Sequence, residues 1–105
     1  MVDRYKSPHP LPTDRQRELL TIMIEECSEV IKDATKWLRF GAKDIDPGKG
    51  DGVTNDERVA LEIGDVSAMV ELLKNAGMVD GRLISEGHSE KLVRVERFMQ
   101  SEEDE

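Results

Sequence analysis

Two pairs of acidic residues have the spacing that brings carboxylates together on a helix. The first pair is Glu26 and Glu29, and the second pair is Glu62 and Asp65. Side chains at positions i and i+3 are neighbours on one face of an α-helix. A set of carboxylate oxygens suits a hard cation such as Mg²⁺, with Mn²⁺ as an alternative. The spacing therefore predicts a divalent-cation site, provided that both segments are helical.

Capping signals divide the chain into three predicted helices that can carry these acids. Thr13 and Thr54 are each followed three positions later by Gln or Glu, which is the capping-box spacing of a helix start. Gly41 and Gly77 suit the positions just beyond a helix end, where glycine is favoured. The predicted helices span the residues between 13 and 41, about 55–76, and about 82–100. The two acid pairs fall on the first and the second of these helices.

Proline and glycine mark the segments outside the predicted helices. Three prolines in residues 1–12 predict an extended arm, because each proline fixes φ and disfavours helix at the residue before it. The glycine-rich stretch 41–54 predicts a solvated, flexible connector, and residues 101–105 form an acidic tail. No stretch of the sequence alternates between apolar and polar residues for long enough to predict a strand. The sequence therefore predicts one all-α domain over residues 13–100, a helical bundle of three main helices.

The acids of the first helix lie within an apolar face. A helical wheel predicts a main apolar, core-facing stripe made of Leu20, Ile24, Cys27, Ile31, Ala34 and Leu38. About 100–160° away from the centre of that stripe lies a second apolar set, made of Leu19, Ile22, Val30, Trp37 and Phe40. Glu26, Glu29 and Asp33 fall inside this second set. The first helix therefore has two apolar faces, and one of them carries acids.

The second helix shows the same conflict between acids and apolar neighbours. Its most apolar stripe consists of Val59, Val66, Met69, Leu73 and Ala76. Glu62 and Asp65 point in the direction of that stripe, where an unpaired carboxylate is costly or takes up a proton. Because lysine and arginine are scarce within either apolar face, the predicted compensating charge is a metal ion. The alternative is two ordinary, solvated acid pairs, but their joint occurrence on successive capped helices favours the metal.

The acidic runs also match a known signature. Glu25-Glu26-Cys27-Ser28-Glu29 followed by Glu62-Ile63-Gly64-Asp65 corresponds to the pattern EExxE…ExxD. Through this pattern the sequence resembles the MazG-like nucleotide pyrophosphohydrolases of the all-α NTP pyrophosphatase group. The similarity covers residues 14–100, with a helix order that is also similar. The interval between the two runs is somewhat long for that family, because of the glycine-rich stretch.

The resemblance implies both a reaction and an assembly. Members of the family hydrolyse nucleoside triphosphates to monophosphate and pyrophosphate, and they assemble as a dimer or a dimer of dimers. The implied ligands of Mg²⁺ are Glu26, Glu29, Glu62 and Asp65. With Mg²⁺ bound, the local charge inverts and phosphates become ligands. Glu25 or Glu29 is predicted as the catalytic residue that accepts the proton of the attacking water. Attack at the α-phosphorus follows from the resemblance alone.

Four further residues are candidates for substrate binding. Lys91, Arg94 and Arg97 recur at three-residue steps on the third helix and form a basic ridge. Such residues suit a triphosphate, and the alternative is a solvated face that balances nearby acids. Trp37 lies one turn beyond Asp33, where stacking on a base would contribute about 1–3 kcal/mol. Its alternative role is packing in the core or in a dimer interface.

Composition limits the compartment and the partners. The 105 residues include 15 Lys and Arg against 23 Asp and Glu, for a net charge of −8. This acidic balance argues against binding to a nucleic-acid polymer, which needs a basic surface. No apolar run approaches the ~18–20 residues of a membrane span, and no signal-peptide pattern is present. The single Cys27 excludes an intrachain disulfide and predicts the reducing cytoplasm.

Three functions remain open. The leading prediction is an Mg²⁺-dependent nucleoside triphosphate pyrophosphohydrolase, whose partners are its nucleotide substrate and further copies of itself. Self-association follows from the two apolar faces of the first helix, which a three-helix monomer cannot both cover. A close alternative is a phosphoribosyl-ATP pyrophosphatase of the same fold. The alternative from another class is a non-catalytic helical interaction module, against which the intact acids at all four ligand positions argue.

Overall fold

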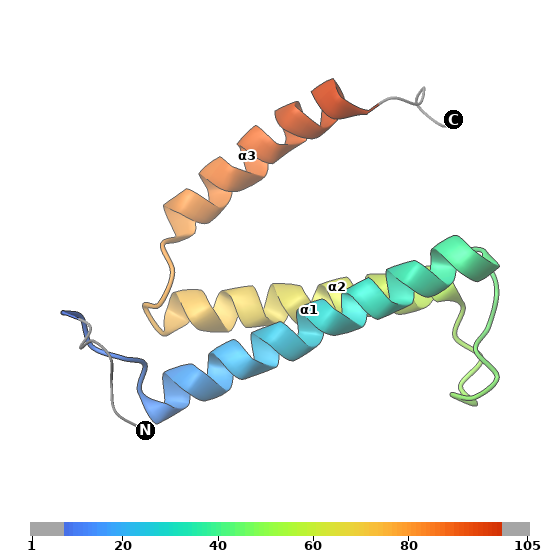
Figure 1. Cartoon of the computed structure of the whole chain (residues 1–105), viewed down its shortest axis with the longest axis horizontal. Coiled ribbons are helices and arrows are strands. Elements are labelled where there is room, and N and C mark those ends of the chain that lie inside the picture. Colours follow the sequence, from blue (N-terminus) through green and yellow to red (C-terminus); the bar gives the residue numbers. More distant parts are fainter. Residues whose placement is uncertain (1–7, 100–105) are drawn as a thin grey trace.

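Residues 8–99 of the computed structural model are described, and they form three α-helices (Figure 1). The helices are α1 (Asp14–Phe40), α2 (Asn55–Asn75) and α3 (Gly81–Phe98). Within residues 8–99 the one element of β-structure is an isolated bridge between Ile45 and Thr54. The all-α prediction is therefore confirmed. The first seven residues of the predicted arm, position 100 and the predicted acidic tail 101–105 lie outside the described residues.

Local hydrogen bonds explain why the helices begin and end where they do. The backbone N–H of Gln16 donates to Thr13 Oγ1 at 3.2 Å, and the backbone N–H of Thr13 donates back to Gln16 Oε1 at 2.9 Å. At the start of α2, the backbone N–H of Thr54 donates to Glu57 Oε1 at 3.0 Å. Gly77 follows α2 with a φ of 71°, a left-handed conformation that favours glycine. Both capping boxes and the end of α2 are confirmed.

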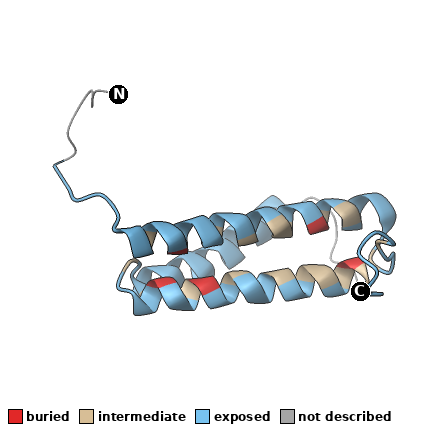
Figure 2. Ribbon diagram, turned by 90° about the horizontal axis from the view of Figure 1, so that it is seen from below, coloured by how far each residue is buried: buried red, intermediate tan, exposed pale blue. Residues whose placement is uncertain are grey.

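α1 and α2 lie side by side and antiparallel, and their facing sides enclose the core (Figures 1 and 2). Among the described residues, this pair forms the one extensive helix–helix interface. Leu19 of α1 and Met69 and Leu73 of α2 are buried there, and Met23 and Met78 pack against them. The predicted apolar stripe of α2 thus supplies two of the three core residues.

The main apolar stripe predicted for α1 is not the side that faces the core, and that prediction is wrong. Ala34 is half-buried, but the other five residues of the stripe are exposed: Leu20, Ile24, Cys27, Ile31 and Leu38. α1 instead packs on α2 through the side that carries Leu19, Met23 and the acids. The physical reason is that α2 packs on the other side of α1 while α3 packs extensively against neither helix, so no described helix covers the stripe (Figure 1).

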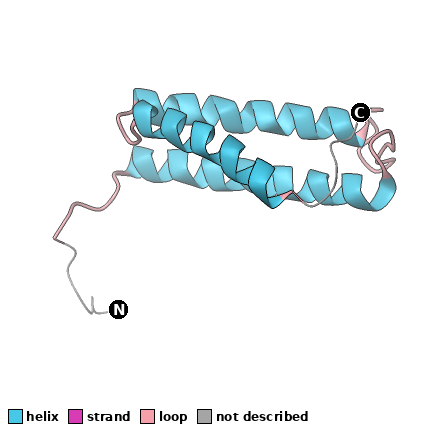
Figure 3. Cartoon of the chain, turned by 90° about the horizontal axis from the view of Figure 1, so that it is seen from above, coloured by secondary structure: helices cyan, strands magenta, loops and turns pink. Residues whose placement is uncertain are grey.

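α3 is exposed along its length. It crosses over the α1–α2 pair when seen from above (Figure 3), yet it packs extensively against neither helix within the described residues. Its apolar side chains are exposed too, including Leu92, Val95 and Phe98. None of the three described helices combines the length and the apolar character that a membrane crossing needs.

Ion pairs hold the connection between α1 and α2, residues 41–54, against both helices. Lys36 Nζ of α1 donates to Asp46 Oδ2 at 2.7 Å. Arg58 of α2 pairs with Asp51 near the other end of the connection. The connection is therefore tied to the helices that it joins, which its glycine-rich composition did not indicate.

Asp56 links the start of α2 to this connection, and its carboxylate makes stability depend on pH. It accepts a hydrogen bond from Lys43 Nζ at 2.6 Å and another from the Thr54 hydroxyl, which lower its pKa from 3.8 to about 2. Because the folded-state pKa is the lower one, the carboxylate stabilises the fold above pH 3.8. That contribution is lost as the pH falls through about 2.

Asp56→Asn is therefore expected to lower the melting temperature by a few degrees at pH 6, and by progressively less as the pH approaches 2.5. Circular dichroism melts at several pH values measure this difference. Asp14→Asn, the same change in the first turn of α1, serves as the matched control. An Asp56→Asn deficit of equal size at pH 6 and pH 2.5 would contradict the assignment of the stabilisation to the carboxylate.

Candidate metal centre

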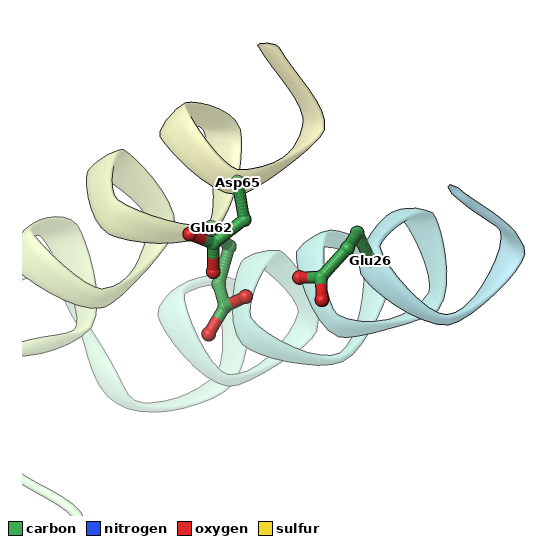
Figure 4. Close-up of side chains that lie close together, drawn as sticks. All are labelled: Glu26, Glu62 and Asp65. Atoms are coloured by element: carbon green, nitrogen blue, oxygen red, sulfur yellow. The ribbon is translucent and has the colours of Figure 1, made fainter. Parts of the chain in front are cut away.

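The acids that the spacing predicts as ligands come from the facing sides of α1 and α2. Glu26 and Glu29 of α1 and Glu62 of α2 are half-buried, and Asp65 of α2 is exposed. Carboxylate oxygens of Glu26, Glu62 and Asp65 all lie within 4.8 Å of one another. Figure 4 shows the three side chains, which come from the two helices. We call these three residues the first acid group.

Burial and mutual repulsion raise the pKa of two acids in this group. For Glu26 the loss of solvation is the largest cause, followed by the negative charge of Asp65 and a hydrogen bond shared with it. For Glu62 burial again comes first, and the charges of Asp65 and Asp33 follow. A raised pKa means that the surroundings disfavour the ionised carboxylate. Burial first, and repulsion between the acids second, therefore disfavour the ionised forms of Glu26 and Glu62.

The donor set fits a hard divalent cation. All candidate ligand atoms are carboxylate oxygens, the type that Mg²⁺ prefers, at about 2.0–2.1 Å from the ion. Two such ligands on opposite sides of an ion are about 4.2 Å apart, so a spacing within 4.8 Å needs only small side-chain adjustments. Within residues 8–99, the four predicted ligands take part in none of the ion pairs. These ligands are Glu26, Glu29, Glu62 and Asp65.

Asp33 is a candidate ligand that the signature does not include. It lies one turn beyond Glu29 on α1 and is only 1% exposed. Carboxylate oxygens of Glu29, Asp33 and Glu62 also lie within 4.8 Å of one another, and we call these residues the second acid group. The helical wheel placed Asp33 on the acidic side of α1. Its i+4 spacing from Glu29 was the available signal, but the four-acid pattern has no position for it.

The two residues predicted to accept a proton differ in their surroundings. Glu29 is half-buried and belongs to the second acid group. Glu25 is exposed and lies in neither acid group, and its backbone carbonyl accepts a hydrogen bond from the Ser28 hydroxyl at 2.7 Å. Of these two residues, Glu29 is therefore the one that lies among the candidate cation ligands.

The residues predicted to bind phosphate lie apart from the acids within one chain. Lys91, Arg94 and Arg97 are exposed on α3. The last two line a shallow surface pocket whose described lining comes entirely from α3. Since α3 makes no extensive contact with α1 or α2 among the described residues, a single chain does not bring this basic ridge to the acid groups.

Trp37, predicted to stack on a base, belongs to neither acid group and is 41% exposed. A surface pocket of 290 Å³ lies nearby, at the C-terminal end of α1. It is lined by Lys36, Phe40, Asp44, Asp46, Pro47 and Asn55. The aromatic residue in this lining is Phe40, which the helical wheel grouped only with the apolar face.

Comparisons of the chain with protein-family models, with curated proteins and with solved structures find no match. In the structure itself, acids of α1 and α2 form two overlapping groups that share Glu62.

Proposed function

We propose that this protein is a divalent-cation-dependent nucleoside triphosphate pyrophosphohydrolase, which converts a (d)NTP and water to (d)NMP and pyrophosphate. One observation carries the proposal: α1 and α2 bring five carboxylates into two overlapping groups, and all but Asp65 are half-buried or buried, namely Glu26, Glu29, Asp33 and Glu62. Such an arrangement is costly without a compensating cation. The resemblance of the two acidic runs to the MazG-like signature supplies the reaction class.

In this proposal Glu26, Glu29, Glu62 and Asp65 hold Mg²⁺, with Mn²⁺ as an alternative. Bound there, the ion would polarise the α-phosphoryl oxygens and lower the pKa of a water molecule. Glu29 accepts a proton from the water as its oxygen attacks the α-phosphorus. A new bond forms between that oxygen and the α-phosphorus, the α–β anhydride bond breaks, and pyrophosphate leaves.

A triphosphate also needs positively charged side chains beyond the cation. Lys91, Arg94 and Arg97 suit this role, because arginine matches phosphate oxygens with a forked set of donors. Since α3 extends away from α1 and α2 (Figure 1), the helices that carry the acids, the ridge serves the acid groups of a second copy in this proposal. The active form is therefore a homodimer or a homotetramer.

The proposal places the protein in the cytoplasm. Its single cysteine, Cys27, is free and exposed on α1. A free, exposed thiol suits a reducing compartment.

Product analysis with a panel of canonical and modified nucleoside triphosphates, together with phosphoribosyl-ATP, tests the proposed function. We expect monophosphate and pyrophosphate in equal amounts by chromatography, with Mg²⁺ required and a chelator abolishing the reaction. Turnover of phosphoribosyl-ATP alone would identify the related pyrophosphatase instead. Diphosphate and orthophosphate as main products would mean attack at the γ-phosphorus. No turnover of any compound would favour the helical interaction module.

A further inference from the structure

Asp33 is a buried carboxylate whose hydrogen-bonding capacity is not satisfied. It is 1% exposed, and among the described residues it is the one side chain that is fully buried. Its Oδ2 atom has no hydrogen-bond partner. Leaving a carboxylate oxygen buried without a partner is costly. Because the carboxylate lies with those of Glu29 and Glu62, the position favours a bound cation.

Nearby cations do not balance the charge of the second acid group. Its three carboxylates have oxygens within 4.8 Å of one another. Lys49 Nζ lies 4.0 Å from Asp33 Oδ1, which is beyond hydrogen-bonding distance. Lys36 and Arg58 also interact electrostatically with Asp33, but Lys36 pairs with Asp46 and Arg58 pairs with Asp51. These three cations are shared among five carboxylates, because two of them pair with Asp46 and Asp51, so negative charge remains on the second acid group.

We propose that the second acid group binds a divalent cation of its own, Mg²⁺ or Mn²⁺, with Asp33 as its most buried ligand. Glu62 belongs to both acid groups and would be shared between the two cation positions, whereas Glu29 belongs to the second group alone and would serve its ion. An all-carboxylate donor set selects hard ions of this kind. The inference rests on the proposed function, since both ions would serve the same triphosphate, and it adds a ligand at position 33 that the four-acid signature lacks.

Lys49 competes with this cation. It lies in the connection 41–54, which ion pairs hold against the helices, and its side chain is 29% exposed. Its ammonium group approaches Asp33 from that connection. A divalent ion among the carboxylates repels the ammonium group. Cation binding and the contact between Lys49 and Asp33 therefore oppose each other.

Titration of the full chain with Mn²⁺, followed by the paramagnetic resonance signal of the free ion, tests the assignment of Asp33. We expect two ions per chain in the wild-type protein. Asp33→Asn is expected to lose the second ion or to bind it at least about 10-fold more weakly, because a neutral amide replaces a charged ligand. Asp14→Asn, the same change at an exposed position of α1, should still bind two. One ion per chain in the wild type, or unchanged binding in Asp33→Asn, overturns the proposal.

Lys49→Met provides a second test of the proposal that leaves every acid in place. This test remains informative even if the Asp33→Asn protein does not fold. Removing the ammonium group is expected to tighten the weaker Mn²⁺ site by on the order of 10-fold. Lys43→Met is the matched control in the same connection, where the lysine side chain is 82% exposed. An equal effect of the two lysine substitutions, or no effect of either, contradicts the competition.

Neither ion count depends on a substrate, so the two proposals can fail separately. Two Mn²⁺ ions per chain that depend on Asp33, without pyrophosphate release from any nucleotide, would overturn the proposed function alone. Pyrophosphate release by a protein that binds one ion per chain would overturn the second cation position alone.

Discussion

Replacing Glu62 with glutamine is expected to raise the stability of the cation-free protein at neutral pH and to remove most of the stabilisation that Mg²⁺ provides. Glu62 belongs to both acid groups, and burial, Asp65 and Asp33 raise its pKa. Above this raised pKa, the ionised carboxylate of Glu62 therefore lowers the free energy of unfolding. This loss disappears as the pH falls toward 4.5, the ordinary pKa of a glutamate side chain. Glutamine removes the cost at neutral pH but cannot replace the carboxylate as a ligand.

The loss of Mg²⁺ stabilisation is the larger of these two effects. A ligand present at 100 times its Kd stabilises a fold by about 2.7 kcal/mol, or roughly 10–20 °C in melting temperature for a domain of this size. Thermal melts with saturating Mg²⁺ and with a chelator measure this shift. Glu71→Gln, at an exposed position of the same helix, should retain the full shift. An equal Mg²⁺ shift in Glu62→Gln would contradict the site assignment.

Light scattering at micromolar concentration is expected to give a mass of at least twice 11.9 kDa. The chain exposes 9073 Å² of surface, whereas a compact monomer of this mass exposes about 5,900 Å². Part of the excess comes from the exposed apolar side chains of α1 and α3, which are the kind of surface that an obligate homodimer buries. The radius of gyration also indicates an extended chain, because it is 18.1 Å, whereas a compact chain of this length has about 13 Å.

The surface that a second copy would cover includes the exposed stripe of α1. Ile31 lies in that stripe and is 68% exposed. Ile31→Glu would bury a charge in the interface, so it is expected to weaken association by at least about 100-fold and to abolish activity. Lys32→Glu, at the next position of α1, points about 100° away and should leave the assembly intact. A stable, active wild-type monomer of 11.9 kDa would contradict the expected assembly.

The helices were predictable because their signals are local. Thr13 and Gln16 are three residues apart, and the hydrogen bonds of a capping box join residues at that separation. The observed bounds of α1 and α2 therefore lie within one residue of the predicted bounds. The core side of α2 was predictable as well, because Met69 and Leu73 lie in its most apolar stripe and are buried.

The side of α1 that faces the core was not predictable from periodicity alone. Periodicity finds apolar faces but does not say which neighbour covers each face, and α1 has two of them. The stripe with Ile24 and Ile31 was the more regular, yet α2 packs on the other face. Asp33 escaped the prediction for a related reason, because its burial depends on α2 and its contact with Lys49 depends on the connection 41–54.

Hydrolysis in ¹⁸O-labelled water tests the central claim most directly, namely that the acids of α1 and α2 support cation-dependent attack of water at the α-phosphorus. We expect mass spectrometry to find the label in the nucleoside monophosphate and none in pyrophosphate, with Mg²⁺ required. Glu62→Gln protein, purified in parallel, should form neither product at a measurable rate. Label in pyrophosphate or orthophosphate, or unchanged turnover by Glu62→Gln, would contradict the claim.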